Sequence, residues 1–510
     1  MARAAGVVGA ATLLSRILGF VRDATIAAVF GAGGGADAFI VAFRVPNLWR
    51  RLVADGALTV AFIPAFLDIA AREGRPSAFR MAGAAIGRFA LLLCGAALLG
   101  VWAAPGVVSL LAPGFSDRPE LFRDTVELTR IMMPFLPLAG AAAVCMGVLQ
   151  ALDRFAAPAL SPVCLNLAMI GAVAATSGRG GSAAVALAAG VVIGGILQLG
   201  LQLGALSRAG FRFRAGNGRA VSGLGRLAAR TVPAALGSSV FQVNVLVGTL
   251  LASFLPEGRV AALYYADRLV EFPLGLIGAA LATAALPSLS RCAAAADWDA
   301  LGDDARFALR LTMFLTIPAA AGLFALREPI VALLFGRGAF DPGAIRWTAE
   351  ALAGFAVGLP AFAGTRVVAS ACFAAGDART PLLAGLGAIS VNAALGFPFR
   401  EQWGLPGIAL ALAVASAVHF GLMAAAIRRR IGPLCDRAFR KSACQSVAGS
   451  VMMSIAALYC SRLFPPTGGT LFRSAALVTA ILAGMAVYAA FAFCVRHPEL
   501  APFLAAIRKE

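Results

Sequence analysis

The chain has 510 residues, of which 60% are hydrophobic and only 13% charged, and its formal net charge at pH 7 is +18. Because soluble globular proteins carry about twice this fraction of charged residues, the composition excludes a soluble enzyme. A helical membrane span needs ~20 mainly apolar residues, so the chain has room for about a dozen spans or more. It is predicted to be a polytopic membrane protein.

Fourteen apolar segments follow one another, separated by charged or Gly/Pro-rich breaks. They cover residues 5–32, 38–70, 89–111, 130–152, 155–176, 183–206, 231–255, 260–289, 307–326, 347–375, 381–399, 404–427, 442–460 and 474–494. In lipid, backbone groups must be satisfied within a segment, and these segments are too long for barrel strands. The predicted fold is therefore all-α, with about 14 transmembrane helices. The first segment lacks an obvious cleavage site and is interpreted as a span, not a signal peptide.

Basic residues in alternate loops predict the orientation in the membrane. The loop after the sixth segment contains six arginines and no acid, and the loop after the twelfth contains five arginines and Lys441 against Asp436. Because positive residues favour the cytoplasmic side, both of these loops and both termini are predicted to be cytoplasmic. The loop after the eighth segment contains mainly aspartates, but acids contribute little to this rule.

An internal repeat has a spacing near 223 residues. The matched pairs include Pro64 and Pro287, Pro137 and Pro360, Asp153 and Asp377, and Asn166 and Asn392. Six spans separate the copies, so the halves have the same topology. The repeat predicts two six-helix lobes, residues 1–218 and 219–436, followed by an appended helix pair at 437–510. Two such lobes with a cavity between them are typical of transporters.

Charged and polar residues are concentrated in three of the predicted spans, although an arginine at a span centre costs ~2.5–3.5 kcal/mol. The first span contains Arg16, Arg22 and Asp23; the second contains Asp37, Arg44, Asn47, Arg50, Arg51 and Asp55; and the eighth contains Asp267, Arg268 and Glu271. Arg16 lies ~17 Å from the start of its span, near the membrane midplane. Pro46 is predicted to kink the second span. Arg51 with Asp55, and Arg268 with Glu271, have the spacing of intrahelical ion pairs.

Two interpretations of these charges stay open. They can form interhelical salt bridges and nothing more, an alternative that is strongest near the predicted span ends. The residues concerned are Asp37, Arg44, Arg51 and Asp55. The functional interpretation is an anion site, because four arginines face only two nearby acids and guanidinium groups bind phosphate oxygens bidentately. Those arginines are Arg16, Arg22, Arg50 and Arg268, and the acids are Asp23 and Glu271. A diphosphate head group would suit the excess positive charge, while its lipid tail stays in the bilayer.

No enzyme motif is present: the sequence has no P-loop lysine motif, no HExxH and no convincing nucleophile elbow. The nine cysteines have no metal-like spacing, and the two histidines, His419 and His497, stand far apart. No catalytic residue, metal site or cofactor is therefore predicted. Transport would have to use an ion gradient, the membrane potential or the gradient of the substrate itself.

Several ordered stretches of sequence resemble one known family. They are SRILGFVRD at 15–23, FGAG at 30–33, DAF at 37–39, PNLWRR at 46–51, DGA at 55–57, APGF at 112–115, YYADRLVEFP at 264–273 and LPSLS at 286–290. Together they resemble the bacterial lipid II flippase family, MurJ (also called MviN). The resemblance extends through the first twelve segments and is weak in the last two.

The resemblance implies a fourteen-helix member of the multidrug/oligosaccharidyl-lipid/polysaccharide (MOP) exporter superfamily. It implies a transporter, not an enzyme, that moves the undecaprenyl-diphosphate-linked peptidoglycan precursor, lipid II, to the outer leaflet of the bacterial inner membrane by alternating access. In that family the functional arginines of a central cavity match Arg16, Arg22, Arg50 and Arg268, with Asp23 beside them. The full set of predicted substrate-binding residues is Arg16, Arg22, Asp23, Asn47, Arg50, Arg51, Asp55, Arg268 and Glu271. Structural or gating roles are predicted for Asp37, Arg44, Pro46 and Asp267.

The source of energy is predicted from a departure from the family pattern. Some members are thought to bind sodium through acids in the seventh and eleventh helices, whereas residues 231–255 and 381–399 contain neither Asp nor Glu. This difference argues against sodium coupling and favours the membrane potential. The expected partners are lipid II, membrane lipids and, as a possible further partner, the cell-wall synthesis machinery, with no nucleic acid.

Three alternative functions remain. A flippase for another lipid-linked oligosaccharide would need the same arginines. A multidrug/cation antiporter of the same superfamily would need a cavity dominated by acids, whereas this one is rich in arginine. A non-transporting membrane scaffold or virulence factor would leave the charges near the midplane without a reason.

Overall fold

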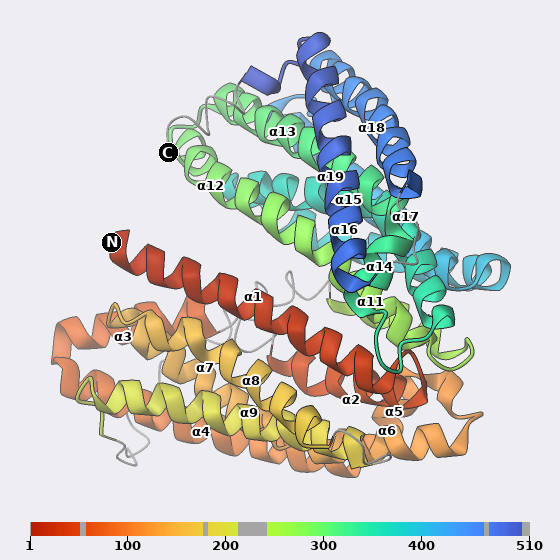
Figure 1. Ribbon diagram of the computed structural model, residues 1–510. Coiled ribbons are helices and arrows are strands. Elements are labelled where there is room, and N and C mark those ends of the chain that lie inside the picture. Colours follow the sequence, from red (N-terminus) through yellow and green to blue (C-terminus); the bar gives the residue numbers. More distant parts are fainter. Residues whose placement is uncertain (1, 51–57, 177–181, 213–241, 464–468, 502–510) are drawn as a thin grey trace. The chain divides into compact units, whose positions relative to one another are not determined.

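The computed structural model describes residues 2–50, 58–176, 182–212, 242–463 and 469–501 (Figure 1). Within these ranges the regular structure is helical, and no strand occurs among them. Ten helices of the described ranges are long and apolar enough to cross a membrane. The predicted all-α fold is confirmed.

The chain forms two compact units. Unit 1 comprises Met1–Gln242, Pro256–Ala261 and Gly338–Phe340, and unit 2 comprises Val243–Leu255, Ala262–Arg337 and Asp341–Glu510. The boundary predicted at residue 218 falls outside the described residues, and the one predicted at residue 436 stays a prediction.

The helices of unit 1 are α1 (Ala2–Phe30), α2 (Gly34–Arg50), α3 (Leu58–Glu73), α4 (Arg75–Trp102), α5 (Ala104–Leu111), the short 3₁₀ helix η2 (Pro113–Phe115), α6 (Pro119–Met132), α7 (Phe135–Ala151), α8 (Ala156–Ala175) and α9 (Ser182–Ser207). In unit 2 a short apolar helix, Gln242–Ser253, is followed by α11 (Arg259–Pro273), which begins in unit 1, the π-helix η4 (Leu274–Gly278), α12 (Ala279–Ala294), α13 (Trp298–Ala325), α14 (Arg327–Phe335), α15 (Pro342–Ala374), α16 (Arg379–Trp403), α17 (Leu405–Ile431), α18 (Arg437–Leu463) and α19 (Thr470–Cys494).

Proline interrupts three segments that were predicted as continuous spans. Segment 89–111 divides between α4 and α5, with Pro105 in the first turn of α5. Segment 130–152 begins inside α6 and continues as α7 after Pro134. Segment 260–289 changes from α-helix to π-helix directly after Pro273. Because proline has no N–H to donate, each break occurs where the helical hydrogen-bond ladder loses a member.

The acidic loop predicted after the eighth segment is longer than the loop in the structure. The loop is short, because α13 begins at Trp298, nine residues before the predicted start of its span. Asp297 caps this helix, with its Oδ1 accepting a hydrogen bond from the N–H of Ala300 at 2.9 Å. Asp299 follows in the first turn, where a negative charge is favourable next to the positive end of the helix dipole. The aspartates therefore start a helix.

Helix α8 packs between α1 and α9 in unit 1. Glycine makes the close approach to α9 possible, because a Cβ built at Gly194 would lie 2.9 Å from the Cα of Leu165. In a bilayer, helices associate largely through this kind of small-residue packing. The consequence is that α8 holds a fixed position against α1, the helix that carries Arg16, Arg22 and Asp23.

The described residues that follow α19 contact two other helices of unit 2. Glu499 is 2% exposed, and its Oε1 lies 2.7 Å from Nε of Arg310 in α13. His497 accepts a hydrogen bond at Nδ1 from the N–H of Glu499 (3.3 Å), while its Nε2 lies 3.1 Å from the carbonyl oxygen of Ser442 in α18. Since a carbonyl only accepts, the Nε2 of His497 carries the proton. These contacts attach the residues after α19 to both α13 and α18.

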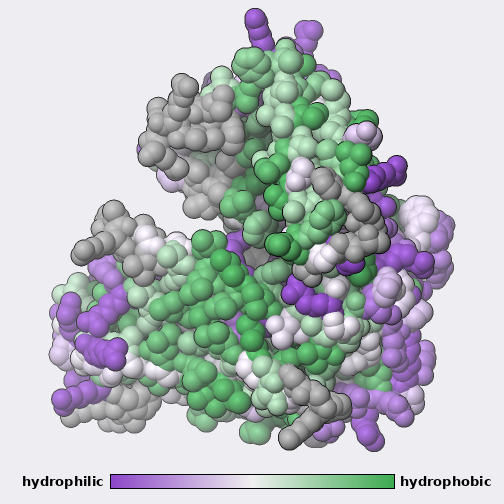
Figure 2. Space-filling model, viewed as in Figure 1, coloured by the Kyte–Doolittle hydropathy of each residue, from purple (hydrophilic) through white to green (hydrophobic). Residues whose placement is uncertain are grey.

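Hydrophobic side chains cover much of the visible surface. In unit 1, Figure 2 shows them over the middle of the helices, with hydrophilic residues gathered toward the helix ends. Helix α4 contributes a row of exposed large side chains, of which Leu91 is 75% and Trp102 is 81% exposed. Extensive apolar exposure of this kind is the property expected of a surface in contact with lipid.

Candidate functional site

Arg22 and Asp23, neighbours on α1, form a buried ion pair in unit 1. The Nε and Nη2 atoms of Arg22 lie 2.9 and 2.7 Å from Oδ1 of Asp23. The side chains are 11% and 4% exposed, respectively. The cost of burying either charge alone is high, and the pairing reduces it. This pair is the charged centre of the first part of the predicted site.

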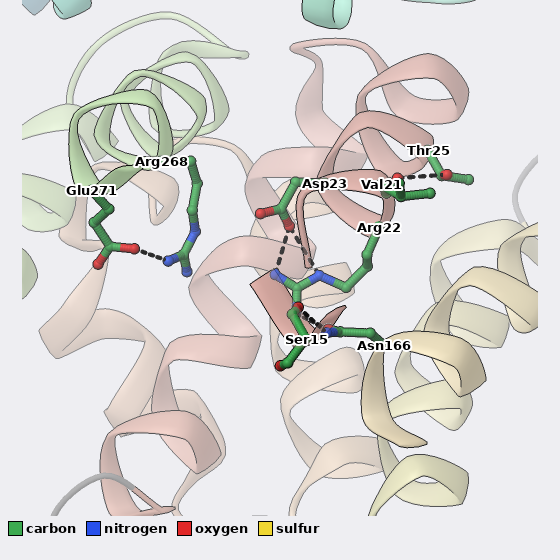
Figure 3. Close-up of polar contacts among 8 residues, drawn as sticks. All are labelled: Ser15, Val21, Arg22, Asp23, Thr25, Asn166, Arg268 and Glu271. Carbon is green, nitrogen blue, oxygen red and sulfur yellow. Dashed lines mark hydrogen bonds and ion pairs between the residues drawn. The ribbon is translucent and has the colours of Figure 1, made fainter. Parts of the chain in front are cut away.

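Asn166 of α8 completes this arrangement. Its Oδ1 accepts a hydrogen bond from Nη1 of Arg22 at 3.0 Å, and its Nδ2 donates to the carbonyl oxygen of Ser15 at 3.1 Å (Figure 3). Sequence reasoning did not assign Asn166 to the site. The available signal was its position in the repeat, where it corresponds to Asn392.

Arg16 lies one and a half turns before Arg22 on α1 and is exposed within the described part of the chain. Among the described residues, no hydrogen bond or ion pair joins Arg16 to another side chain. Its predicted role as a binding residue stays a prediction.

Asp37 of α2 is 1% exposed and caps the first turn of α11. Its Oδ2 accepts a hydrogen bond from the N–H of Gly258 at 2.6 Å, and its Oδ1 accepts from the N–H of Ala261 at 2.7 Å. A carboxylate is suited to this position, because the first N–H groups of a helix have no partner within the helix and carry the positive end of its dipole. Asp37 therefore caps a helix, and the structural or gating role predicted for it stays a prediction.

The residues just before α2 also contact a distant part of unit 1. The N–H of Ala339 donates to the carbonyl oxygen of Ala28 at 2.7 Å. Gly31 and Gly338 both have positive φ angles, +61° and +62°, and a Cβ built on Gly338 would lie 2.1 Å from the oxygen of Ala28. Glycine is required at both positions, because a side chain would be strained and would collide with the backbone.

The remaining predicted residues of the second span are only partly described. Arg44 and Asn47 are half-buried on α2, and Pro46 is a buried member of this helix. Arg50 is the last residue of α2, and its side chain lies outside the described part of the structure. Arg51 and Asp55 lie outside the described residues. The predicted kink at Pro46 and the predicted Arg51–Asp55 pair therefore stay predictions.

Arg268 and Glu271 of α11 form the ion pair that their spacing predicted (Figure 3). The guanidinium carbon of Arg268 also lies 4.8 Å from the ring centroid of Tyr264, one turn earlier on the same helix. Stacking on an aromatic face and pairing with a carboxylate both fix the orientation of the guanidinium group. Asp267, the neighbouring acid, is half-buried. This pair is the charged centre of the predicted site in unit 2.

Two span arginines outside the predicted site also have partners in unit 2. Arg310 pairs with Glu499, as described above, and Nη1 of Arg366 in α15 lies 3.5 Å from the carbonyl oxygen of Leu274 in the π-helix. Both arginines lie inside segments predicted as spans, where a charged side chain by itself indicates that a partner is needed. Their partners lie 189 and 92 residues away in the sequence, at distances that spacing along a helix does not reveal.

The position in unit 2 that corresponds to Asn166 is Asn392, whose side chain contacts another amide. Nδ2 of Asn392 in α16 donates to Oδ1 of Asn244 at 3.1 Å, and both residues are buried. Among the described residues, no group of three or more His, Cys, Asp or Glu side chains could hold a metal ion. The chemistry of the two units at this position is therefore different, with a guanidinium in the first and two amides in the second.

Comparison with known proteins identifies the family. The family model described as "Lipid II flippase MurJ" matches residues 26–479. A protein of Rhizobium meliloti (strain 1021), named "Probable lipid II flippase MurJ", is 36% identical over 98% of this chain and 95% of its own length. This chain belongs to the MurJ family. A MurJ protein of Burkholderia cenocepacia is 35% identical over 82% of both chains.

Solved structures show the same fold. A structure described as "Lipid II flippase MurJ, inward closed conformation" aligns over 96% of this chain and 98% of its own, with a TM-score of 0.80 and 23% identity. An inward-facing multidrug resistance MATE family transporter of the MOP superfamily aligns over 84% and 96%, with a TM-score of 0.69 and 16% identity. The predicted MurJ family and MOP-type fold are confirmed, and the chain is a multi-pass membrane protein.

Proposed function

We propose that this protein moves lipid II from the inner to the outer leaflet of the bacterial inner membrane by alternating access. The family match along residues 26–479 supports this function more than the alternatives. The observation that carries it is the pair of half-buried guanidinium groups, those of Arg22 and Arg268, each oriented by a carboxylate in a chain that is 60% hydrophobic. Moving a lipid from one leaflet to the other breaks no covalent bond, so we expect no enzymatic activity.

The arginines suit the head group of this substrate. A diphosphate presents several negative oxygens, and a guanidinium binds such oxygens through parallel N–H donors. Arg22 and Arg268 are each held in one orientation by an acid, Asp23 or Glu271, so little conformational freedom is lost when an anion binds. With Arg16 and Arg50 added, the predicted arginines outnumber the acids Asp23 and Glu271 by two, so this set of residues carries a net positive charge.

The membrane potential is the proposed source of energy. A diphosphate head group that moves outward carries negative charge away from the negative cytoplasmic side, which releases about 2.3 kcal/mol per charge at 100 mV. The amide pair Asn244 and Asn392 lies on the two helices where acids would be needed for sodium, and amides contribute no negative charge to attract a cation. Sodium coupling is therefore not part of the proposal, and no cofactor is required.

The proposed orientation places both termini in the cytoplasm. The basic end of α17, Arg428–Arg430, and the basic start of α18 define one cytoplasmic loop. The proposed partners are lipid II and the surrounding membrane lipids, with the cell-wall synthesis machinery as a further candidate.

The test is transport in proteoliposomes that contain the full-length protein. Lipid II should reach the outer leaflet faster than other undecaprenyl-diphosphate-linked sugars, and an inside-negative potential should increase the rate of outward movement. Arg22→Gln and Arg268→Gln should each reduce the rate at least about 30-fold, the effect expected when one member of a buried, hydrogen-bonded charge pair is lost. Arg72→Gln is the matched control, because Arg72 forms an exposed pair with Asp68. Equal rates for lipid II and the other lipid-linked sugars would favour a flippase with a broader substrate range.

A further inference from the structure

We propose that Asn166 is a positioning residue, whose side-chain amide sets the orientation of the Arg22 guanidinium toward the lipid diphosphate. The inference rests on the proposed function of Arg22 and adds a residue that neither the charge pattern nor the intrahelical spacing indicates. It follows from three properties of the site: hydrogen-bond chemistry, packing and charge.

The hydrogen-bond chemistry requires an amide at position 166. Arg22 can only donate hydrogen bonds, and the carbonyl oxygen of Ser15 can only accept them. Asn166 meets both requirements on one rigid planar group, because its Oδ1 faces Nη1 of Arg22 at 3.0 Å and its Nδ2 faces the Ser15 oxygen at 3.1 Å (Figure 3). An aspartate would offer only acceptors when ionised, and a leucine would offer neither.

The packing around Asn166 prevents the amide from turning away. Asn166 is 5% exposed. Ser15 and Arg22 are seven residues apart, so they lie on one face of α1 about two turns from each other. Gly19 lies between them, and a Cβ built there would be 3.6 Å from the Nδ2 of Asn166. The amide thus lies directly against the backbone of α1, while the close contact at Gly194 holds α8 from its other side.

Charge explains why a neutral group is suitable here. Asp23 already provides the carboxylate that makes burial of Arg22 possible. A second carboxylate at position 166 would pair with the same guanidinium and reduce the excess of arginines over acids in the predicted site from two to one. A neutral acceptor fixes the guanidinium without weakening its attraction for an anion.

Binding of undecaprenyl diphosphate to the purified full-length protein in nanodiscs tests the proposal. Asn166→Leu removes both hydrogen bonds at nearly constant volume, and Asn166→Asp keeps an acceptor but adds a charge. Each should raise the Kd about tenfold, the effect of weakening one charge-assisted contact. Asn392→Leu is the matched control, since it disrupts the corresponding buried amide contact of the repeat, and its Kd should change less than about twofold.

The dependence on Arg22 separates positioning from a general structural role. In an Arg22→Gln background, Asn166→Leu should weaken binding by less than a further factor of about two, because the group that it positions is already absent. A full tenfold loss in that background, or unchanged binding by both Asn166 variants alone, would overturn the inference. If Arg22→Gln binds undecaprenyl diphosphate like the unaltered protein, the proposed site itself fails, which is a distinguishable result. Thermal unfolding of each variant identifies any that do not fold, and Asn166→Asp serves if Asn166→Leu is among them.

Discussion

The two copies of the repeat differ at one corresponding pair of asparagines. In unit 1, Asn166 contacts the guanidinium of Arg22, whereas in unit 2 Asn392 contacts the amide of Asn244. The offset of 223 residues that the earlier matched pairs share places Val245 at the position of Arg22, so the second copy has an apolar side chain where the first has its arginine. The sequence repeat contains the asparagine twice, but of the two described contacts only that of Asn166 is to a charged side chain.

This difference shows that an asparagine repeated in the sequence can serve different contacts in the two units. The asparagine can bridge two helices in either copy, because an amide both donates and accepts. Unit 2 carries its own charged pair on α11 instead, where Arg268 and Glu271 are three residues apart. The repeat in the sequence therefore does not require the same charged contacts in both units: Arg22 lies on α1 of unit 1, and Arg268 lies on α11 in unit 2.

The largest expected effect is on the charged copy. Asp23→Asn leaves Arg22 without its carboxylate in a buried position, which should destabilise unit 1 by about 3–5 kcal/mol. Asn244→Leu in the neutral copy should cost about 1–3 kcal/mol, because only a polar group loses its partner. Denaturant unfolding of both variants in the same detergent measures the two values. A larger loss for Asn244→Leu would contradict the view that the contact with a charged partner, that of Asn166, contributes more than the contact between two amides.

The second prediction concerns the ion pair between Arg310 and Glu499, which are far apart in the sequence, whereas Arg22 and Asp23 are neighbours. Glu499→Gln should destabilise unit 2 by about 2–3 kcal/mol, since Arg310 loses its carboxylate but is 22% exposed to begin with. The double variant Arg310→Met/Glu499→Met should recover most of this loss, because a well-packed apolar pair often replaces a buried ion pair without cost. Thermal unfolding provides the measurement. If the double variant is no more stable than Glu499→Gln, the charge of Arg310 is not the cause.

The smallest expected effect on stability concerns the turns that precede α8 and α16. These turns contain Asp153 and Asp377, a matched pair of the repeat in the sequence. Asp377 accepts hydrogen bonds from the Thr380 hydroxyl at 2.6 Å and from the N–H of Thr380 at 2.9 Å, and these bonds lower the pKa of its carboxyl below the ordinary value. The ionised form is favoured by folding, so its contribution of about 1 kcal/mol is present above pH 4 and is lost as the pH falls through the lowered pKa. Unfolding followed between pH 3 and pH 6, as approximate limits, measures the change.

The variant Asp377→Asn provides the comparison for that prediction. It should lose this pH dependence, whereas Asp153→Asn should leave it intact and change stability by less than about 0.5 kcal/mol. Asparagine is well tolerated at Asp153, where φ is +58°. An unchanged acid transition in Asp377→Asn would assign the titration to another group.

The family, the helical fold and one ion pair of the site could be predicted from the sequence. Arg268 and Glu271 pair because their spacing on a single helix brings them together, and such local geometry follows from the helical period alone. The breaks at Pro105, Pro134 and Pro273 were missed, because hydropathy averaged over a span does not register one missing hydrogen bond.

The contacts between distant helices were not predictable in this way. Asn166 lies 144 residues from Arg22, and Glu499 lies 189 residues from Arg310. The partners of Asn166 and Glu499 cannot be inferred from a charge pattern or from sequence spacing, because each contact depends on which faces of two distant segments meet. The repeat offered a partial route, because it singled out Asn166 and Asn392 as equivalent before their contacts were known.

The cap that Asp37 provides for α11 has a practical consequence for dividing this protein. Gly258 and Ala261, which donate to Asp37, belong to unit 1 although residues on both sides of this segment belong to unit 2, and Gly338–Phe340 repeats this pattern. A gene cut once between the two repeats would therefore produce an N-terminal fragment that lacks part of unit 1, whereas the C-terminal fragment would contain all of unit 2. The C-terminal half would have to supply these two short segments to the N-terminal half before unit 1 was complete, so complementation by split halves should be much harder to achieve than the tandem sequence suggests.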